Sequence, residues 1–402
     1  MLYYLVRPVA RYVLRYYYRH IDLAGLEHIP PEAAVILASN HPTAFIEPCI
    51  LACFQPRSLH FLARGDLYKN KLAIRVLRAL HILPVYRMQD GGYGKLTENY
   101  ATFEACYKVL SRRRALMILA EGRCINEKRL RPLKKGTARI ALGALDRDTT
   151  LPEVYIVPVG VNFVAAERVR STVMIRCGKP LLASQYLQTY RENEAMGLRA
   201  LTEDLREALS EHVLQLPAAA DDALYEAHLQ LVRNELPPLS RSVTHGGVQL
   251  ATELAVVASG RPDERVLTYT QRLQHLGITD RDLLTSGATE PMPWLAFLAL
   301  FLLIPQLPLW LIAEIIALGG PRTVEFYSPV RFAAVAVGTV VSLLALLVLS
   351  WAGKLYFALS LLLNNWSLRQ LEAWRQWRGR RRAQQLDPEL RAELLTLRQD
   401  LL

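Results

Sequence analysis

The sequence predicts an α/β fold: a largely parallel sheet flanked by helices, followed by a helical region and a membrane hairpin. Two observations lead to this prediction. Short apolar runs of strand length alternate with helix-like stretches over residues 21–180, and such alternation is typical of parallel sheets covered by helices. Two long uncharged runs follow after residue 290, and each is about long enough to cross a hydrocarbon core of roughly 30 Å.

Five apolar runs are the predicted strands: Val35–Ala38, Leu59–Ala63, Ala115–Leu119, Tyr155–Val159 and Val173–Cys177. Helix-like stretches separate them, such as Asn70–Leu80 and Asn99–Arg112. From about Leu181, leucines and valines recur at three- and four-residue steps, which predicts helices with one apolar face. Ligands of parallel sheets bind beyond the carboxyl ends of the strands, so the segments that follow these runs are where a site is expected.

The segment Asn40–Pro48 places a histidine and a carboxylate close together directly after the first predicted strand. A histidine takes up a proton near neutral pH, and a carboxylate on its second ring nitrogen holds it in the right tautomer. His41 and Glu47 could therefore activate a hydroxyl group. The alternative is a loop histidine beside a carboxylate that the dipole of a following helix favours.

Three later segments accompany this one in a recognisable order: Ile82–Arg87, Leu119–Cys124 and Ile156–Asn162. Together the four blocks resemble the glycerolipid acyltransferase family, which esterifies glycerol phosphates and lysophospholipids from acyl thioesters. The resemblance runs from about Ile21 to Pro180. Leu130–Gly136 resembles an extension of the third block in the branch that contains fungal glycerol-3-phosphate and dihydroxyacetone-phosphate acyltransferases. That branch usually has aspartate where Glu47 stands.

The resemblance implies a reaction. His41 would act as the general base on the acceptor hydroxyl, and Glu47 would orient its ring while the oxygen attacks the thioester carbonyl. The thioester is already activated, so no cysteine or serine nucleophile is needed, and neither a metal nor another cofactor is expected. The donor would be acyl-CoA or acyl carrier protein, and the acceptor would be glycerol 3-phosphate or lysophosphatidate.

Cationic side chains in the later blocks are candidates for binding the acceptor phosphate, because a planar guanidinium matches phosphate geometry. In order of preference they are Arg87, Arg123, and then Lys134 with Lys135. By resemblance, Glu121 would hydrogen-bond the glycerol and Gly122 would allow close approach of the backbone. The alternative is that the arginines form surface ion pairs and that Glu121 and Gly122 only make a turn.

Charge and hydropathy favour a membrane with anionic lipids over nucleic acid as the partner. The formal charge of +11 suits either, but two uncharged runs, residues 294–313 and 332–352, are uncommon in soluble nucleic-acid binders. The first contains Pro305 and Pro308, so it is predicted to kink or to form a re-entrant hairpin if it does not span. Six arginines lie between positions 369 and 382. The positive-inside bias therefore predicts a multi-pass membrane protein whose catalytic domain and both termini are cytoplasmic.

Five regions follow from these patterns. They are an interfacial amphipathic helix rich in tyrosine and arginine at 1–20, an acyltransferase domain at 21–180, a helical region at 181–290, two membrane segments (294–318 and 332–352) within 291–365, and a basic cytoplasmic tail at 366–402. The predicted function is acyl transfer in phosphatidic acid synthesis. Two alternatives stay open: a non-catalytic membrane protein that binds anionic lipid, and a lipid hydrolase that uses histidine and glutamate.

Overall fold

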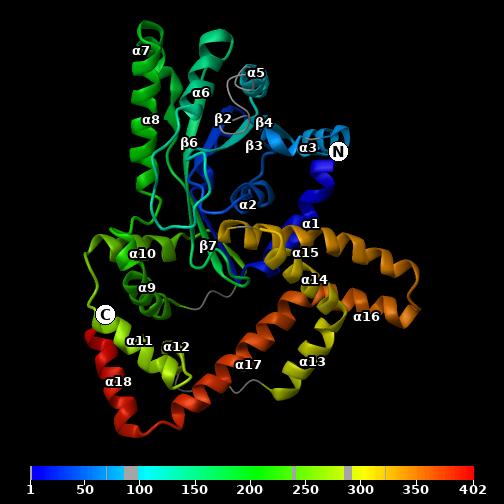
Figure 1. The fold of residues 1–402 in the computed structure, drawn as a ribbon, viewed down its shortest axis with the longest axis vertical. Helices are drawn as coiled ribbons and strands as arrows, with labels where there is room; N and C mark the ends of the chain where they lie inside the picture. The colour runs from blue at the N-terminus through cyan, green and yellow to red at the C-terminus, as the bar shows by residue number, and fades with distance from the viewer. Residues whose placement is uncertain (1, 69, 86–97, 238–240, 285–291, 322) are drawn as a thin grey trace. The chain divides into compact units, whose positions relative to one another are not determined.

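The computed structural model describes residues 2–68, 70–85, 98–237, 241–284, 292–321 and 323–402 (Figure 1). The chain divides into two compact units. Unit 1 comprises Met1–Leu214, Val243–Gly247 and Gly320–Phe332, and unit 2 comprises Gln215–Ser242, Val248–Gly319 and Ala333–Leu402. Unit 1 therefore contains both the predicted acyltransferase domain and a short segment from the far end of the chain.

Unit 1 is built on one sheet, whose described strands run in the order β4-β3-β5-β2-β6-β7-β1-β9, with β8 paired to β6. The strands are β1 (His20–Ala24), β2 (Ala34–Ser39), β3 (Leu59–Arg64), β4 (Ile82–Val85), β5 (Ala115–Leu119), β6 (Val154–Phe163), β7 (Thr172–Cys177), β8 (Leu181–Leu182) and β9 (Val243–Thr244). Among the described strands, the β6–β7 and β6–β8 pairs are antiparallel and the other pairs are parallel. The predicted α/β class with a largely parallel sheet is confirmed, and all five predicted strands are present.

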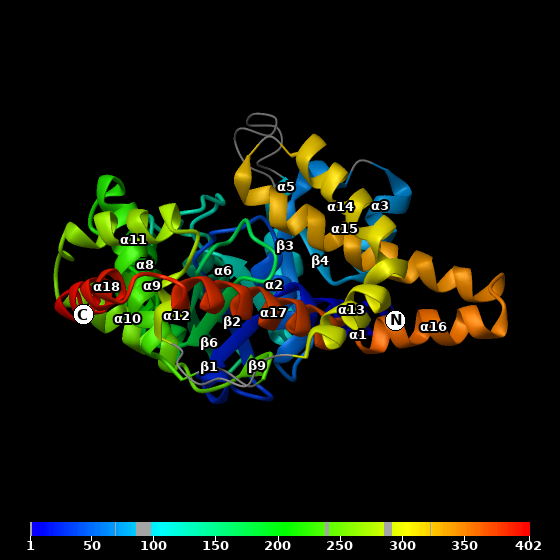
Figure 2. The ribbon, with the colours of Figure 1, turned by 90° about the horizontal axis from the view of Figure 1, so that it is seen from below.

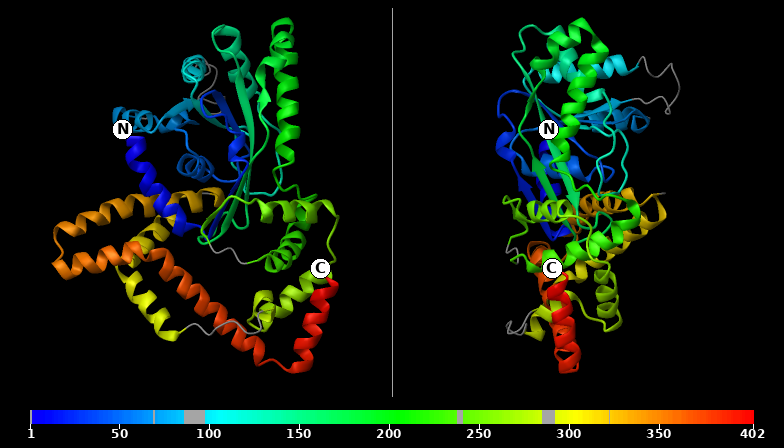
Figure 3. Two further views of the ribbon diagram at one scale, coloured as in Figure 1. Left: turned by 180° about the vertical axis from the view of Figure 1, so that it is seen from behind. Right: turned by 90° about the vertical axis from the view of Figure 1, so that its left-hand side faces the viewer.

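Helices cover the sheet, and both faces of its central strands are buried. The helices of unit 1 are α1 (Leu2–Tyr17), α2 (Ile46–Phe54), α3 (Lys71–Ala79), α5 (Glu98–Ser111), α6 (Gly136–Arg147), α7 (Leu187–Glu192) and α8 (Glu194–Ser210), and Figure 3 shows α6 and α8 beside the strands. Ile36 on β2 belongs to a core shared with α5, α6 and α8. Its neighbours Val35 and Leu37 point to the other face and are also fully buried. Burial on both faces explains why the strands read as continuous apolar runs.

Most tyrosines at the N-terminus face the protein interior. Tyr3, Tyr16, Tyr17 and Tyr18 are all buried. The hydroxyl of Tyr17 donates to the main-chain oxygen of Ser328 at 2.9 Å, because a buried phenol needs a hydrogen-bond partner. These four tyrosines therefore do not form part of the lipid-facing surface that an interfacial helix at 1–20 would need. The idea that α1 is an interfacial helix stays a prediction and now depends on its exposed residues, which include Tyr4, Leu5 and Val6.

Unit 2 is helical. Its helices are α9 (Asp222–Glu235), α10 (Val248–Ala258), α11 (Arg265–His275), α12 (Asp280–Leu284), α13 (Pro293–Leu303), α14 (Leu307–Gly319), α16 (Trp351–Leu362), α17 (Asn364–Gln384) and α18 (Pro388–Asp400), with most of α15 (Tyr327–Ser342). Two helical stretches of the described chain are long and apolar enough to cross a membrane, Trp294–Gly319 and Val324–Ser342. The first is interrupted by a 3₁₀ turn that contains Pro305.

The second apolar run of the sequence is not one helix. α15 ends at Ser342, a 3₁₀ segment covers Leu343–Leu347, and α16 begins at Trp351 and runs back (Figure 2). The hydroxyl of Ser350 accepts a hydrogen bond from the N–H of Gly353 at 3.3 Å, which is an N-cap that starts a new helix. The predicted segment 332–352 is therefore corrected to a helix, a turn and the start of a second helix. Hydropathy missed the turn because its residues are as apolar as the arms.

A buried and a half-buried histidine, His60 and His81, stack in unit 1. The rings of His60 and His81 are 4.6 Å apart and nearly parallel, and Tyr3 stacks on His81 at 4.7 Å. Burial, followed by the charges of His81 and Arg114, lowers the pKa of His60 to about 4. Burial also lowers the pKa of His81. Both rings are therefore neutral in the folded protein near pH 7.

We expect the protein to lose stability as the pH falls from about 6.5 to about 4. An unfolded histidine takes up a proton in this window while folded His60 does not, so the contribution is complete above pH 6.5 and decreases below it. His60→Phe keeps an aromatic ring in the stack and should flatten the dependence of the unfolding temperature on pH over that window. An unchanged slope in the variant would contradict this assignment.

Candidate active site

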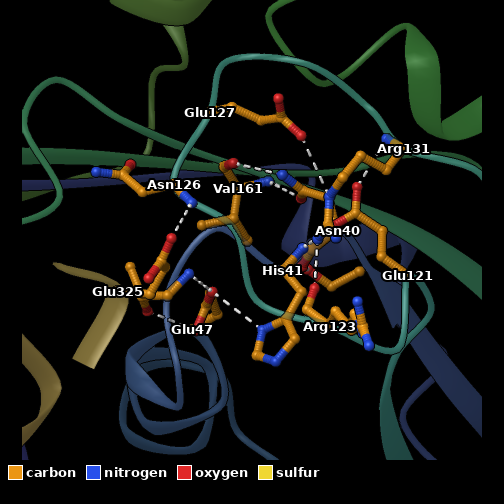
Figure 4. A network of polar contacts seen from close by, with 12 residues as sticks. Asn40, His41, Glu47, Glu121, Arg123, Asn126, Glu127, Arg131, Val161 and Glu325 are labelled. Atoms are coloured by element: carbon orange, nitrogen blue, oxygen red, sulfur yellow. Dashed lines mark hydrogen bonds and ion pairs between the residues drawn. The ribbon is translucent and has the colours of Figure 1, made fainter. Parts of the chain in front are cut away.

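The candidate site lies where β2, β5 and β6 end. β2 pairs in parallel with both neighbours, so the carboxyl ends of the three strands share one edge of the sheet. The loop after β2 carries His41, the first turn of α2 carries Glu47, and the loop after β5 carries Glu121 (Figure 4). The fold thus joins blocks that are separated by 80 residues, and the N–H of His41 donates to Oε2 of Glu121 at 2.8 Å.

His41 and Glu47 face each other across the turn that precedes α2. Nδ1 of His41 lies 3.6 Å from Oε1 of Glu47, which is too far for a hydrogen bond, and this nitrogen has no partner among the described residues. The side chains are buried, with residue exposures of 6% and 0%. Glu47 instead accepts hydrogen bonds from the N–H and the hydroxyl of Thr43, at 2.7 and 2.8 Å. Glu47 therefore closes the loop and keeps a carboxylate beside the imidazole.

The carboxylate of Glu121 joins three segments. Besides the N–H of His41, it accepts the N–H of Arg131 at 2.9 Å and the guanidinium of Arg131 at 2.6 Å. Glu121 is only 4% exposed, and three donors with one cation compensate its buried charge. The guanidinium also donates to the main-chain oxygen of Arg123 and lies 3.4 Å from Glu127. A carboxylate offers about four acceptor positions, so the predicted contact of Glu121 with glycerol has little room and stays a prediction.

Asn40 attaches the His41 loop to strand β6. Its amide nitrogen donates to the main-chain oxygen of Val161 at 2.9 Å, and its amide oxygen accepts the N–H of Val161 at 2.8 Å. Asn40 is buried, so both hydrogen bonds replace contacts that water would otherwise make. The position of His41 is thus set on both sides, by Asn40 before it and by Glu121 at its own N–H.

A segment from much later in the sequence completes the network. Glu325 accepts the N–H of Asn126 at 3.2 Å through its carboxylate, and its main-chain oxygen accepts the N–H of Ala44 at 3.3 Å. Both partners lie in loops of the site, as Figure 4 shows. Glu325 belongs to the segment Gly320–Phe332 of unit 1, which therefore packs on the loop that carries His41.

Three residues of this network were missed by the analysis of the sequence. Asn40 directly precedes His41, so its position after a strand was an available signal. Arg131 lies inside the extension of the third block, but nothing local distinguishes it from the neighbouring cations. Glu325 has no local signal in the sequence, because its partners Asn126 and Ala44 lie far from it in the chain.

Three of the four cations predicted to bind phosphate lie within the described residues. Arg87 lies outside them, whereas Arg123, Lys134 and Lys135 are all exposed on the loops that flank Glu121. The N–H of Lys134 donates to the main-chain oxygen of Ala120 at 2.8 Å. Their role in binding phosphate stays a prediction. In the part of the chain that the structure describes, no three His, Cys, Asp or Glu residues are placed to hold a metal ion.

Gly122 adopts a conformation that favours glycine. Its φ is +73°, a left-handed value that side chains disfavour. A Cβ at this position would lie 3.1 Å from Cγ of Lys134. Gly122 therefore turns the chain directly after Glu121 and lets the stem of Lys134 lie against the backbone.

The contacts of Asn40 predict a specific effect on activity. Asn40→Ala leaves the buried N–H and C=O of Val161 without partners, at a cost of about 1–3 kcal/mol for each group. Asn162→Ala is a matched control, because Asn162 bonds the main chain of His212 and Leu214 in the same way, away from His41. We expect both variants to lower the unfolding temperature, and only Asn40→Ala to slow acyl transfer in the folded protein, by about 10- to 100-fold. Equal losses of activity in the two variants would contradict this.

Comparisons with known proteins agree with the geometry. Residues 20–162 match the protein family described as Acyltransferase. The chain is 22% identical over 207 residues to glycerol-3-phosphate O-acyltransferase 2 of Saccharomyces cerevisiae, a match that covers 49% of this chain and 27% of the yeast protein. It is 24% identical over 230 residues to an uncharacterised acyltransferase of Schizosaccharomyces pombe, covering 54% of this chain and 32% of that protein. The chain thus spans about a third or less of the length of these relatives.

Among solved structures, the chain is similar to the 1-acyl-sn-glycerophosphate (LPA) acyltransferase of Thermotoga maritima. The TM-score is 0.37 at 14% identity, over 52% of this chain and 79% of that one. The matched residues 20–162 include His41, Glu47 and Glu121, which belong to the sequence blocks that carry the resemblance. Residues 20–162 are thus similar to the acyltransferase domain of glycerolipid acyltransferases.

Proposed function

We propose that this protein transfers a fatty acyl group from an acyl thioester to a hydroxyl of glycerol 3-phosphate or lysophosphatidate. The observation that carries the proposal is the pair of His41 and Glu47, buried together at the carboxyl edge of the sheet within the acyltransferase domain. A general base needs an oriented ring and a second group that stabilises its protonated form. Glu47, whose carboxylate lies 3.6 Å from Nδ1 of His41, supplies a negative charge that can orient the ring and stabilise its protonated form.

The reaction follows from this arrangement. His41 removes the proton of the acceptor hydroxyl as its oxygen attacks the thioester carbonyl, and the ring becomes positively charged beside Glu47. The carbon–sulfur bond then breaks, and the thiolate leaves with the proton that His41 carried. Catalytic hydrogen bonds are often long before the substrate binds, so a small rotation of the imidazole toward Glu47 would complete the pair. No cofactor takes part.

Arg131 and the other cations have different tasks in this proposal. The guanidinium of Arg131 is held by Glu121 and is a positioning residue for the loop of His41. Arg123, Lys134 and Lys135, which are exposed, and Arg87 are the proposed ligands of the acceptor phosphate. The name of the yeast relative supports glycerol 3-phosphate as the acceptor to test first. Acyl-CoA or acyl carrier protein is the proposed donor.

We also propose that the protein works at a membrane with anionic lipids and that its catalytic domain and termini are cytoplasmic. Support comes from the two apolar helical stretches and the net charge of +11. The exposed side chains of the two apolar helical stretches are mostly large and apolar, including Phe297, Leu311 and Val341, as expected of surfaces that contact lipid. The cytoplasmic side is the one on which both proposed donors occur.

The test is thiol release from a long-chain acyl-CoA, with lipid products identified, in the presence of glycerol 3-phosphate, lysophosphatidate or no acceptor. We expect acceptor-dependent release that falls about 10²- to 10⁴-fold in His41→Ala, with binding to lipid vesicles unchanged. Glu47→Gln should also be impaired, because an amide cannot stabilise the imidazolium. His245→Ala is the control, since His245 is exposed outside the matched domain.

Three results would contradict the proposal. Release of free fatty acid without an acceptor, if lost in His41→Ala, would identify a hydrolase. Equal turnover by the wild type and His41→Ala would exclude His41 as the base. Vesicle binding without turnover of acyl-CoA or acyl carrier protein substrates would indicate the non-catalytic lipid-binding protein.

A further inference from the structure

The first candidate span, Trp294–Gly319, is flanked in sequence by two segments that both belong to unit 1. Before it, strand β9 pairs with β1. After it, Glu325 accepts the N–H of Asn126 at 3.2 Å, and Tyr17 donates to the main-chain oxygen of Ser328 at 2.9 Å. Segments that pack on one domain lie on one side of a membrane. The chain between them must therefore cross the membrane an even number of times.

A single crossing by Trp294–Gly319 breaks this rule, and its two halves are too short to cross separately. α13 has 11 residues and α14 has 13, which is about 16 and 20 Å of helix, whereas the hydrocarbon core is about 30 Å thick. The other apolar helix described in this interval, Val248–Ala258, has 11 residues. We therefore find no helix that crosses the membrane among the described residues of 248–319.

The neighbour of α13 also argues against a crossing. α13 packs against α17, a helix whose charged residues include Arg369, Glu372 and Arg375. Charges of this density are costly in hydrocarbon, so α13 lies at headgroup depth beside them. Its exposed side chains include Trp294 and Phe297, which are 58% and 71% exposed and suit the interface between water and lipid.

Hydrogen bonds fix the bend between α13 and α14. The amide nitrogen of Gln306 donates to the main-chain oxygen of Ser360 at 2.8 Å, and Asn364 donates to the amide oxygen of Gln306 at 2.6 Å. Gln306 and Asn364 are 3% and 1% exposed. Polar groups at a helix break are satisfied in this way when a neighbouring helix supplies the partners. The two halves are therefore held as separate helices and do not form one straight span.

The hairpin formed by α15 and α16 must also cross the membrane an even number of times, or not at all. Beyond it, Arg398 donates to Asp280 at 2.8 Å and Arg272 pairs with Glu393 at 2.7 Å, so the C-terminal helices belong with α11 and α12, which precede both apolar stretches. The charge-free part of the outward arm begins after Arg331 and comprises Phe332–Ser342 of α15 and the 3₁₀ segment Leu343–Leu347, about 27 Å in all, and α16 is about 18 Å long. Neither of these lengths reaches across a core of about 30 Å.

The tip of this hairpin is apolar. Leu347, Val348 and Trp351 are 78%, 85% and 80% exposed, and no charged residue occurs between Arg331 and Lys354. An aqueous compartment on the far side would be an unfavourable place for such a tip. The hydrocarbon of the leaflet that the hairpin enters offers it a favourable environment.

We infer that the helices after residue 292 enter one leaflet of an anionic membrane without crossing it, so that the protein is monotopic. This inference rests on the membrane association proposed above and replaces the predicted multi-pass topology. The apolar surface of these helices contacts the acyl chains of a single leaflet. The arginines of α17 complement its anionic headgroups.

Single cysteines at Gly320, Val348 and Gln385 test this topology in sealed vesicles of phosphatidylcholine and phosphatidylglycerol. A membrane-impermeant maleimide is applied before and after permeabilisation. The wild type gives the background, to which the partly exposed Cys49 and Cys124 contribute most, because Cys53, Cys106 and Cys177 are buried. We expect Gly320→Cys and Gln385→Cys to react from the same side. Val348→Cys should react from neither side, and a fluorophore attached there should be quenched by lipids that carry a quencher on the acyl chain.

Each other result overturns the inference. Reaction of Gly320→Cys and Gln385→Cys from opposite sides would show that an odd number of crossings lies between them. Reaction of Val348→Cys from the far side would show that the hairpin crosses, and reaction from the near side would show that it does not insert. Failure of the protein to float with vesicles would refute membrane association itself, whereas absence of acyl transfer would leave the labelling result valid.

Discussion

The site depends on one buried carboxylate. Glu121 accepts the N–H of His41 and two donors of Arg131, and so joins the loop after β2, the loop after β5 and the extension before α6. A buried carboxylate is tolerated only when donors and an opposite charge compensate it. The same contacts that make Glu121 tolerable therefore hold His41 in place. Glu47 could not do this alone, because its hydrogen bonds reach only Thr43, four residues before it in the chain.

Local patterns predicted what is local in this fold. The strands could be recognised because burial on both faces makes them continuous apolar runs, and His41 and Glu47 could be paired because six positions separate them. The contact of Glu121 with Arg131 could not be predicted, because residues 123–135 contain six cations that local sequence does not distinguish, and only the folded loop selects one of them. The contact of Glu325 with Asn126 joins residues about 200 positions apart in the chain, and no short sequence pattern relates residues at that distance.

The membrane segments show a different limit. Hydropathy measures the length of an apolar run but contains no information on where its ends are attached. In this protein the attachments decide the topology, since Glu325 and Ser328 return the chain to unit 1 directly after α14. The hairpin turn at Ser350 was also hidden, because a serine N-cap is a weak signal between two apolar arms. The placement of the arms thus depends on hydrogen bonds that composition does not reveal.

The most direct test of the central claim is a double-mutant cycle on Glu121 and Arg131, with kcat for acyl transfer measured at saturating acceptor. If the two residues act as one clamp on His41, Glu121→Gln and Arg131→Gln will each lower kcat, and the double variant will be no slower than the slower single variant. If Glu121 instead binds the acceptor independently of Arg131, the two losses will multiply in the double variant. That result would contradict the account.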